Sequence, residues 1–204
     1  MGNSKLFTPV TFGPLTLRNR TIRSAAFESM CPGNAPSDML LDYHRSVAAG
    51  GIGMTTVAYA AVTRSGLSFD RQLWMRPEII PGLRKLTDAI HAEGAATGIQ
   101  LGHCGNMSHK SICGCTPVGA SGGFNLYSPT FVRGLRADEL PEMARAYGRS
   151  VNLAREAGFD AVEIHAGHGY LISQFLSPST NHRKDEFGGS LQNRMRFMDM
   201  VMEE

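Results

Sequence analysis

Short apolar runs recur along the chain, and each has the alternating or continuous character that is typical of a half-buried or buried strand. The sequence therefore predicts strands over residues 21–27, 54–60, 97–103 and 160–165. Residues 10–20 alternate around Gly13-Pro14, which predicts a small β-hairpin ahead of the first of these strands.

Apolar residues at helical spacing fill the intervals between these strands and follow the last one. We expect helices that begin at Ser37 or Asp38, at Pro77, at Asp138 and at Ser190, the first three of them ended by Gly50-Gly51, Gly94 and Gly158. The faces expected to be buried are Leu40, Tyr43 and Val47; Ile80, Leu83, Leu86 and Ile90; Leu140, Met143, Tyr147, Val151 and Ala154; and Leu191, Met195, Met198 and Met202.

This order, a hairpin and then repeated β-α units, predicts an α/β fold with a parallel sheet and right-handed crossovers. The units present would make an open sheet or half of a (β/α) TIM-type barrel, because a complete eight-fold barrel needs about 250 residues. We expect residues 1–204 to form part of one domain, with no second domain. The sequence stops on Glu203-Glu204 inside a helical pattern, which indicates an interrupted chain.

Charge and composition exclude several kinds of partner. A net charge of +2 over 20 basic and 18 acidic residues leaves no basic stripe, so we expect no nucleic-acid partner. Residues 1–10 lack a secretory leader, and the most apolar run, 51–62, is too short to span a bilayer. We therefore expect a cytoplasmic protein with no membrane partner, in which the 4 cysteines are free thiols.

The most distinctive chemistry lies at the end of the last predicted strand. His165, His168 and Tyr170 follow that strand directly, and Gly167 and Gly169 interrupt it between them. Ligands of parallel α/β folds bind at the carboxyl ends of the strands, so these side chains should meet at a ligand site. Two imidazoles and a phenol can polarise a carbonyl and deliver a proton. An HxxH pair alone is also compatible with one core and one loop histidine.

Residues 104–136 are rich in Gly, Ser, Pro and Cys and show no period, which predicts a long loop of functional or disordered character. A zinc site would need a third ligand from this region, and the candidates are His103, Cys104, His109, Cys113 and Cys115. Their spacing does not match a closed four-ligand site, so we expect no metal.

For two further sets of residues, position alone does not distinguish a structural role from a binding role. Gln100 points to the opposite face of its strand from Ile99 and Leu101, where its amide could bond to neighbouring strands or recognise a planar heterocycle. Ser24, Ala25 and Ala26 could serve close packing or form a surface on which a flat ring lies. No GxGxxG or P-loop sequence supports a Rossmann or P-loop nucleotide site.

Taken together, these stretches resemble the Old Yellow Enzyme family of FMN-dependent, NAD(P)H-using oxidoreductases, which are (β/α)8 barrels. The resemblance rests on LFTPVTFGPLTLRNRTIRSAAF, on GIQLGHCG and on HAGHGYLISQFLSPSTNHRKDEFGGSLQNRMRF, and it covers the whole chain. It identifies the chain with the amino-terminal half of such a barrel.

The resemblance implies a role for each candidate residue. Ser24, Ala25, Ala26 and the main chain at Tyr59 would line the flavin, and Gln100 would bond to its pyrimidine edge. His165 and His168 would hold the carbonyl oxygen of an activated alkene, and Tyr170 would donate the proton after hydride transfer from the flavin. NAD(P)H would reduce FMN first, in a ping-pong sequence.

The chain departs from the family pattern in ways that leave its substrate open. Phe27 stands where some members carry a redox-tuning cysteine, and HCGNMSHKSICGC replaces a more usual basic loop. The family's strand-five arginine and its phosphate site would lie beyond Glu204, as would the iron-sulfur cluster of the dienoyl-CoA reductase branch. Two hypotheses follow: an ene-reductase of which this is the amino-terminal half, or a half-barrel without flavin that self-associates or needs a partner.

Overall fold

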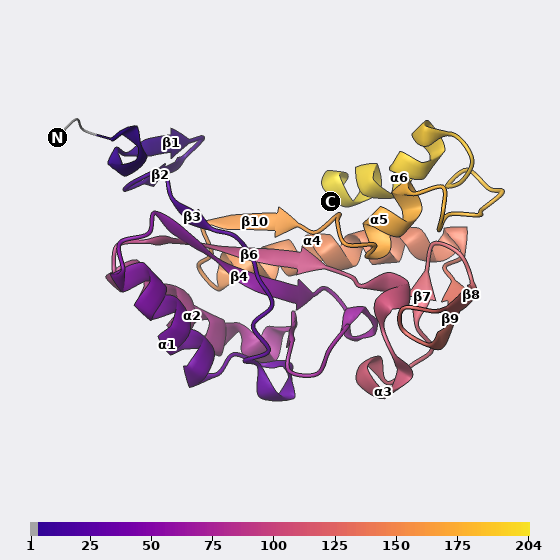
Figure 1. Ribbon diagram of the computed structural model, residues 1–204, viewed down its shortest axis with the longest axis horizontal. Helices are drawn as coiled ribbons and strands as arrows, with labels where there is room; N and C mark the ends of the chain where they lie inside the picture. Colours follow the sequence, from indigo (N-terminus) through magenta and orange to yellow (C-terminus); the bar gives the residue numbers. More distant parts are fainter. Residues whose placement is uncertain (1–3) are drawn as a thin grey trace.

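The centre of the molecule is a parallel sheet whose strands follow one another in chain order (Figure 1). A computed structural model describes residues 4–204; residues 1–3, the start of the stretch searched for a leader, lie outside it. The strands are β3 (Ile22–Arg23), β4 (Met54–Ala61), β6 (Ala96–Gly102) and β10 (Ala161–Ile164), with β5 (Leu73–Trp74) paired to the end of β4. All of these pairings are parallel.

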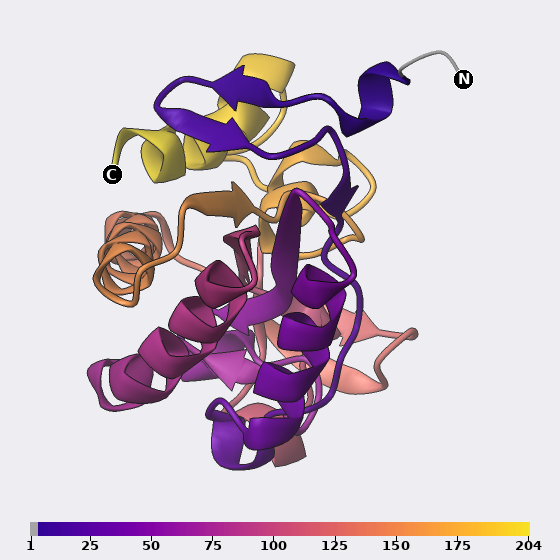
Figure 2. The same cartoon turned by 90° about the vertical axis from the view of Figure 1, so that its left-hand side faces the viewer.

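Helices α1 (Asp38–Ala49), α2 (Ile80–Ala92) and α4 (Leu140–Glu156) connect these strands and lie against the sheet and one another (Figure 2). Two helices follow β10, namely α5 (Leu171–Leu176) and α6 (Leu191–Glu203). The remaining helical turns are η1 (Lys5–Phe7), η2 (Pro32–Asn34), η3 (Arg64–Gly66), η4 (Pro77–Ile79), η5 (Gly105–Met107), α3 (Lys110–Cys113) and η6 (Ala137–Glu139).

This arrangement confirms the predicted half-barrel of βα units. In a complete barrel every strand has two neighbours, whereas β3 and β10 here form the two edges of the main path and the sheet does not close. Its core lies between the sheet and the connecting helices, where Leu40, Leu83, Ile99 and Tyr147 are fully buried. In the described part of the chain, no helix is long and apolar enough to cross a membrane.

The predicted hairpin is also confirmed, as β1 (Val10–Phe12) paired with β2 (Leu15–Leu17). It lies at the amino ends of the strands, opposite to the end at which they finish (Figure 1). Arg18 fixes it there, because its guanidinium donates to the carbonyls of Ala48, Ile52 and Glu93 at 2.5, 2.9 and 2.7 Å. The hairpin thus lies at the amino ends of the strands, away from their carboxyl ends (Figure 1).

The first strand is much shorter than the predicted 21–27. Only Ile22 and Arg23 pair with β4, and Ile22 is 46% exposed, so this is not a buried strand. The segment from Ser24 onward leaves the sheet and runs along the end of β4 as irregular chain. An edge strand is hydrogen-bonded on one side only, and the apolar sequence of residues 21–27 does not show at which residue the pairing with β4 ends.

Three predicted helix faces were partly wrong. The inner face of α1 uses His44 instead of the exposed Tyr43, and Val151 of α4 is exposed. On α6 the residues Phe197 and Val201 are buried, whereas Leu191, Met195 and Met202 are 53%, 40% and 63% exposed. His44 can be buried because both of its ring nitrogens have partners. Of the described elements, α6 packs mainly on α4 and α5, which leaves its methionine stripe uncovered.

Helix starts were predicted better than helix faces. Ser37 and Ser190 cap α1 and α6, each accepting a backbone N–H bond at 3.2 Å. Asp138 does not cap α4. It lies inside the short η6 turn, where Glu139 instead accepts from the backbone N–H of Arg136 at 2.8 Å. Because a turn of 3₁₀ helix precedes α4, the α-helix begins at Leu140, two residues after the expected start.

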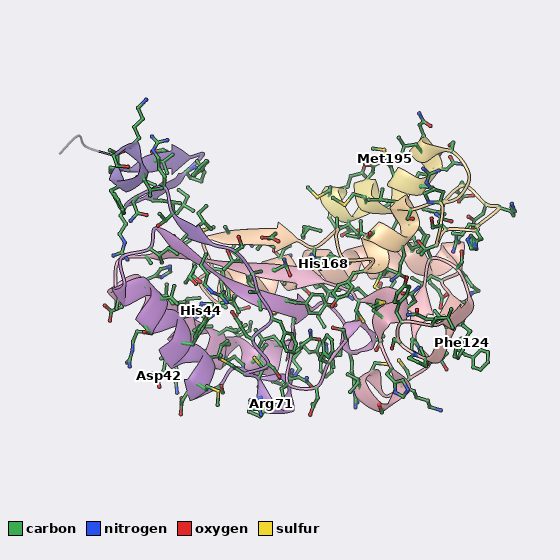
Figure 3. The ribbon with its side chains drawn as sticks, in the orientation of Figure 1. Asp42, His44, Arg71, Phe124, His168 and Met195 are labelled. Carbon is green, nitrogen blue, oxygen red and sulfur yellow. The ribbon has the colours of Figure 1, made fainter. Side chains whose placement is uncertain are left out.

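Residues 104–136 are not a structureless loop. They contain α3 and a three-stranded sheet of β7 (Val118–Gly119), β8 (Gly123–Asn125) and β9 (Thr130–Gly134). These strands are two to five residues long and rich in glycine, so no period could be detected in them. The β8–β9 hairpin stands beside the carboxyl end of the main sheet, with Phe124 projecting outward from it (Figure 3).

Candidate functional site

The end of β10 brings the predicted His165, His168 and Tyr170 together. His165 extends the ladder by one bond, from its N–H to the carbonyl of Leu101 at 2.8 Å. The chain then turns through His168 and Gly169, whose φ angles of 55° and 67° lie in the left-handed region. Because the turn is that tight, Tyr170 returns to the strand ends just before α5 begins, and His168 lies at the open end of the sheet (Figure 3).

The aromatic rings at this end form one cluster. His165 Nε2 and His168 Nδ1 are 3.2 Å apart, so one imidazole donates to the other. The ring of Tyr170 is 5.0 Å from that of His165 and 5.3 Å from that of Tyr59, in edge-to-face contacts. Burial, followed by the neighbouring His168, lowers the pKa of His165, which favours a neutral ring.

The phenol of Tyr170 is held by a loop that sequence reasoning missed. Its oxygen is 3.2 Å from Ser68 Oγ. Gln72 in turn accepts from the Ser68 N–H and hydroxyl through Oε1, at 3.0 and 3.1 Å. Burial raises the pKa of Tyr170, which keeps its proton at neutral pH. Ser68 and Gln72 carry no motif, and only the fold places them here.

Gln100 lies on the pocket side of β6, directly opposite Glu163 in the register of β6 and β10. Its amide nitrogen donates to Glu163 Oε1 at 2.5 Å, which is the inter-strand bond expected of a structural amide. The amide oxygen of Gln100 accepts no hydrogen bond from residues 4–204. Both interpretations of Gln100 therefore stand, since one end of the amide is structural and the other faces the cavity.

One cavity collects nearly all the predicted residues. It is lined by Ala25, Ala26, Phe27, Glu28, Ser29, Cys31, Ala58, Tyr59, Arg71, Gln72, Leu73, Gln100, His165, His168 and Tyr170. The predicted Ser24 is exposed and is not part of this lining. Tyr59 contributes its ring as well as its main chain, and its hydroxyl donates to the carbonyl of Gly66 at 2.5 Å. The small side chains of Ala25, Ala26 and Ala58 leave that side of the cavity flat.

A buried polar network behind Ala25 and Ala26 was not predicted. Glu28 is hydrogen-bonded to His44 Nε2 at 3.0 Å and accepts from the N–H of Ala58 at 3.2 Å, and it forms an ion pair with Arg23 Nη1 at 3.0 Å. The other nitrogen of His44 is 2.8 Å from Thr55 Oγ1, so both nitrogens of the buried ring have hydrogen-bond partners. The β4–β6 register shifts between Val57 and Ala60, and this irregularity turns the Ala58 N–H toward Glu28.

Gly102 is required by the close approach of the aromatic cluster. A Cβ added there would lie 2.5 Å from Cε2 of Tyr59 and 3.2 Å from Cβ of His165. We predict that Gly102→Ala lowers the free energy of unfolding by about 1–3 kcal/mol in urea denaturation, because the Tyr59 ring must move. Gly98→Ala is the matched control, since its nearest contact on the same strand is an ordinary 3.5 Å. An equal loss in both variants would contradict this assignment.

His103, at the end of β6, is fully buried and accepts from the Gly105 N–H through Nδ1 at 3.0 Å, and burial lowers its pKa to about 3. In the unfolded chain the pKa returns to about 6.5, so the unfolded state binds one more proton between these values. We predict that stability falls as pH falls from about 6.5, by up to about 1.4 kcal/mol per pH unit for this residue. Urea denaturation at several pH values should show a shallower slope for His103→Asn, and an unchanged slope would refute the prediction.

The metal candidates of the sequence do not assemble. Among residues 4–204, no three His, Cys, Asp or Glu side chains lie close enough to hold a metal ion. His103 instead bonds to Gly105 and to Ser65, whose Oγ is 3.0 Å from its Nε2.

Comparison with known proteins shows to which family the chain is related. The sequence model of the NADH:flavin oxidoreductase / NADH oxidase family matches residues 5–204. The chain is 41% identical over 198 residues to 4,4'-dithiodibutanoate disulfide reductase of Rhodococcus erythropolis, with 97% of this chain and 49% of the relative covered. It is 37% identical over 205 residues to NADPH dehydrogenase of Bacillus subtilis, with 98% and 59% covered.

Comparison with solved structures points to the same family as the sequence comparison. The Old Yellow Enzyme homologue of Zymomonas mobilis superposes with a TM-score of 0.91 at 30% identity, over 98% of this chain and 59% of that one. A morphinone reductase in complex with tetrahydroNAD gives 0.92 at 29% identity, over 98% and 60%. The chain thus spans about half to three-fifths of the length of these proteins. It belongs to the NADH:flavin oxidoreductase / NADH oxidase family, to which the Old Yellow Enzyme homologues are the structural neighbours.

Proposed function

We propose that the protein carrying this chain is an FMN-dependent oxidoreductase that reduces activated C=C bonds, such as those of enones, with NAD(P)H. The observation that carries the proposal is the cluster of His165, His168 and Tyr170 at one mouth of the cavity, with Gln100 on the adjacent strand. Two hydrogen-bonding rings beside a protonated phenol suit a substrate that develops negative charge on oxygen while it gains a proton on carbon.

The residues present fit one face and one edge of a flavin. Ala25, Ala26 and Ala58 give a flat surface of small side chains, and the Gln100 amide offers an acceptor that no residue in 4–204 occupies. Ser24, which we also propose to line the flavin, would contribute from outside the present cavity. A heterocycle with alternating donors and acceptors matches such an amide. FMN would supply the hydride, having been reduced by NAD(P)H in a ping-pong sequence.

The chain's own residues would orient and protonate the substrate. An oxygen placed between His165 Nε2 and His168 Nδ1 would replace their 3.2 Å contact with two bonds to itself. Tyr170 keeps its proton because burial raises its pKa, and its ring lies beside His165. It would therefore deliver the proton to the carbon neighbouring the carbonyl.

A second candidate is a half-barrel that binds no flavin and associates with itself or with a partner. The observation in its favour is apolar surface at the open side, where Ile22 of the edge strand and the α6 stripe of Leu191, Met195 and Met202 are exposed. Such surface is normally covered. We expect a cytoplasmic protein in either case, and a small-molecule substrate with an activated alkene for the first candidate.

Purification and flavin titration distinguish the two candidates. If the protein is the proposed flavoenzyme, it should be yellow when purified, or gain the flavin absorbance bands when FMN is added. The FMN-loaded protein should then oxidise NADPH in the presence of an enone. A protein that stays colourless with excess FMN and elutes as a dimer in size-exclusion chromatography would refute the first and support the second. A substrate series including an organic disulfide would test the alkene preference, because one relative is named for disulfide reduction.

A further inference from the structure

A pair of thiols lies apart from the proposed active site, where α3 ends. Cys113 is its last residue, Gly114 caps it in the left-handed conformation with φ 75°, and Cys115 follows. The two sulfurs are 3.6 Å apart. Cys113 is 2% exposed, whereas Cys115 is exposed to solvent. Neither residue lines the cavity of Tyr170, so the pair is a separate feature.

The geometry of this pair suits a reversible disulfide. A disulfide bond is about 2.0 Å long, so the sulfurs need to approach by less than the width of one atom. Gly114 has no side chain to resist the change in the turn. The other free cysteines, Cys31 and Cys104, are buried, and neither has a sulfur partner among residues 4–204.

The charge around Cys115 favours an anionic reactant. The Arg64 guanidinium lies against the turn, with Nη2 3.3 Å from the position a Cβ of Gly114 would take. Arg64 forms no ion pair with any acidic residue in 4–204. Partial burial raises the pKa of Cys115 while Arg64 and Arg133 lower it, so proximity of the second thiol, more than acidity, would drive the reaction.

We propose that Cys113 and Cys115 form a thiol–disulfide exchange site for small, negatively charged disulfides. The Cys115 thiolate attacks one sulfur of the reactant, which forms a mixed disulfide and releases one thiolate. The Cys113 thiol then loses its proton and attacks Cys115 Sγ, which closes the protein disulfide and releases the second thiol. The protein loses two hydrogens and the reactant disulfide is reduced to two thiols, so atoms and electrons balance.

Oxidised glutathione is the anionic probe, followed by alkylation and tryptic mass spectrometry of the protein. Trypsin cuts after Lys110 and Arg133, so the peptide of residues 111–133 carries Cys113 and Cys115 and no other cysteine. We expect this peptide to lose two hydrogens and escape alkylation, and dithiothreitol to reverse both changes. Cys113→Ser should trap one glutathione on Cys115, because the resolving thiol is absent.

Two comparisons keep the proposal open to refutation. Arg64→Gln should slow exchange with oxidised glutathione several-fold more than exchange with the cationic disulfide cystamine, because the loss of thiolate at Cys115 affects both reactants and the loss of the cation affects only the anionic one. A peptide of the unsubstituted protein that remains fully alkylated, or that keeps glutathione on Cys115 without closing, would overturn the exchange site. Equal slowing with both reactants would overturn the anionic preference. Flavin content does not enter these measurements, so they stand apart from the proposed function.

Discussion

Replacing Tyr170 with phenylalanine is expected to slow alkene reduction by about 100-fold or more, the range in which a positioned general acid contributes. The phenol oxygen is the only part removed, and its one hydrogen-bond partner in the described part of the chain is Ser68 Oγ at 3.2 Å. Its raised pKa means that the wild-type group is a full acid across neutral pH. The ring, and with it the contacts to His165 and Tyr59, remains in the variant.

The two half-reactions should respond differently, and stopped-flow absorbance of the FMN-loaded protein can follow each. Reduction by NADPH delivers a hydride and needs no proton from Tyr170, so its rate should be nearly unchanged. Reoxidation of the reduced FMN by an enone needs the proton of Tyr170, so the whole loss of rate should fall on this half-reaction. Tyr147→Phe is the matched control, because that phenol is buried on α4 and has no hydrogen-bond partner among residues 4–204. Equal losses in both half-reactions of Tyr170→Phe would refute the proton-donor role.

The parts of this site that could be predicted lie close together in sequence. His165, His168 and Tyr170 fall within one strand end and one turn, so the local pattern alone brings them to the same mouth. The face of Gln100 could be predicted because apolar residues alternate with it in its strand. Its pairing with Glu163 depends on the register between two strands, which alternation within one strand does not determine.

The parts that could not be predicted depend on contacts between distant segments. His44 has the sequence environment of a polar helix position, and nothing local indicates that Glu28 and Thr55 will satisfy both of its nitrogens. The exposed Met195 is the converse case, since its helical spacing predicts burial but nothing in residues 4–204 covers it. Short glycine-rich strands such as β7 fall below the length at which periodicity can be read.

Glu28 is the residue with the largest expected effect on stability. Its side chain is 5% exposed, and it is the common partner of Arg23 in an ion pair and of His44 and the N–H of Ala58 in hydrogen bonds. Removal of one partner from a buried charged network costs more than the network itself contributes, because the remaining groups stay buried without partners. Arg23 keeps two other bonds, to the carbonyl of Thr56 at 2.7 Å and to the Tyr43 hydroxyl at 3.2 Å, whereas His44 Nε2 has no other partner among residues 4–204.

We therefore predict that Glu28→Ala lowers the free energy of unfolding by about 3 kcal/mol, measured as a fall in the urea midpoint at constant m-value. Glu28→Gln should lose less, since the amide oxygen still accepts from His44 while the charge opposite Arg23 is gone. The control is Glu142→Ala, whose ion pairs with Arg145 and Arg149 are exposed, so its removal should barely move the midpoint. A midpoint for Glu28→Ala that matches Glu142→Ala would mean that water reaches His44, and the site would then lack the rigid wall that a flat ring requires behind Ala25 and Ala26.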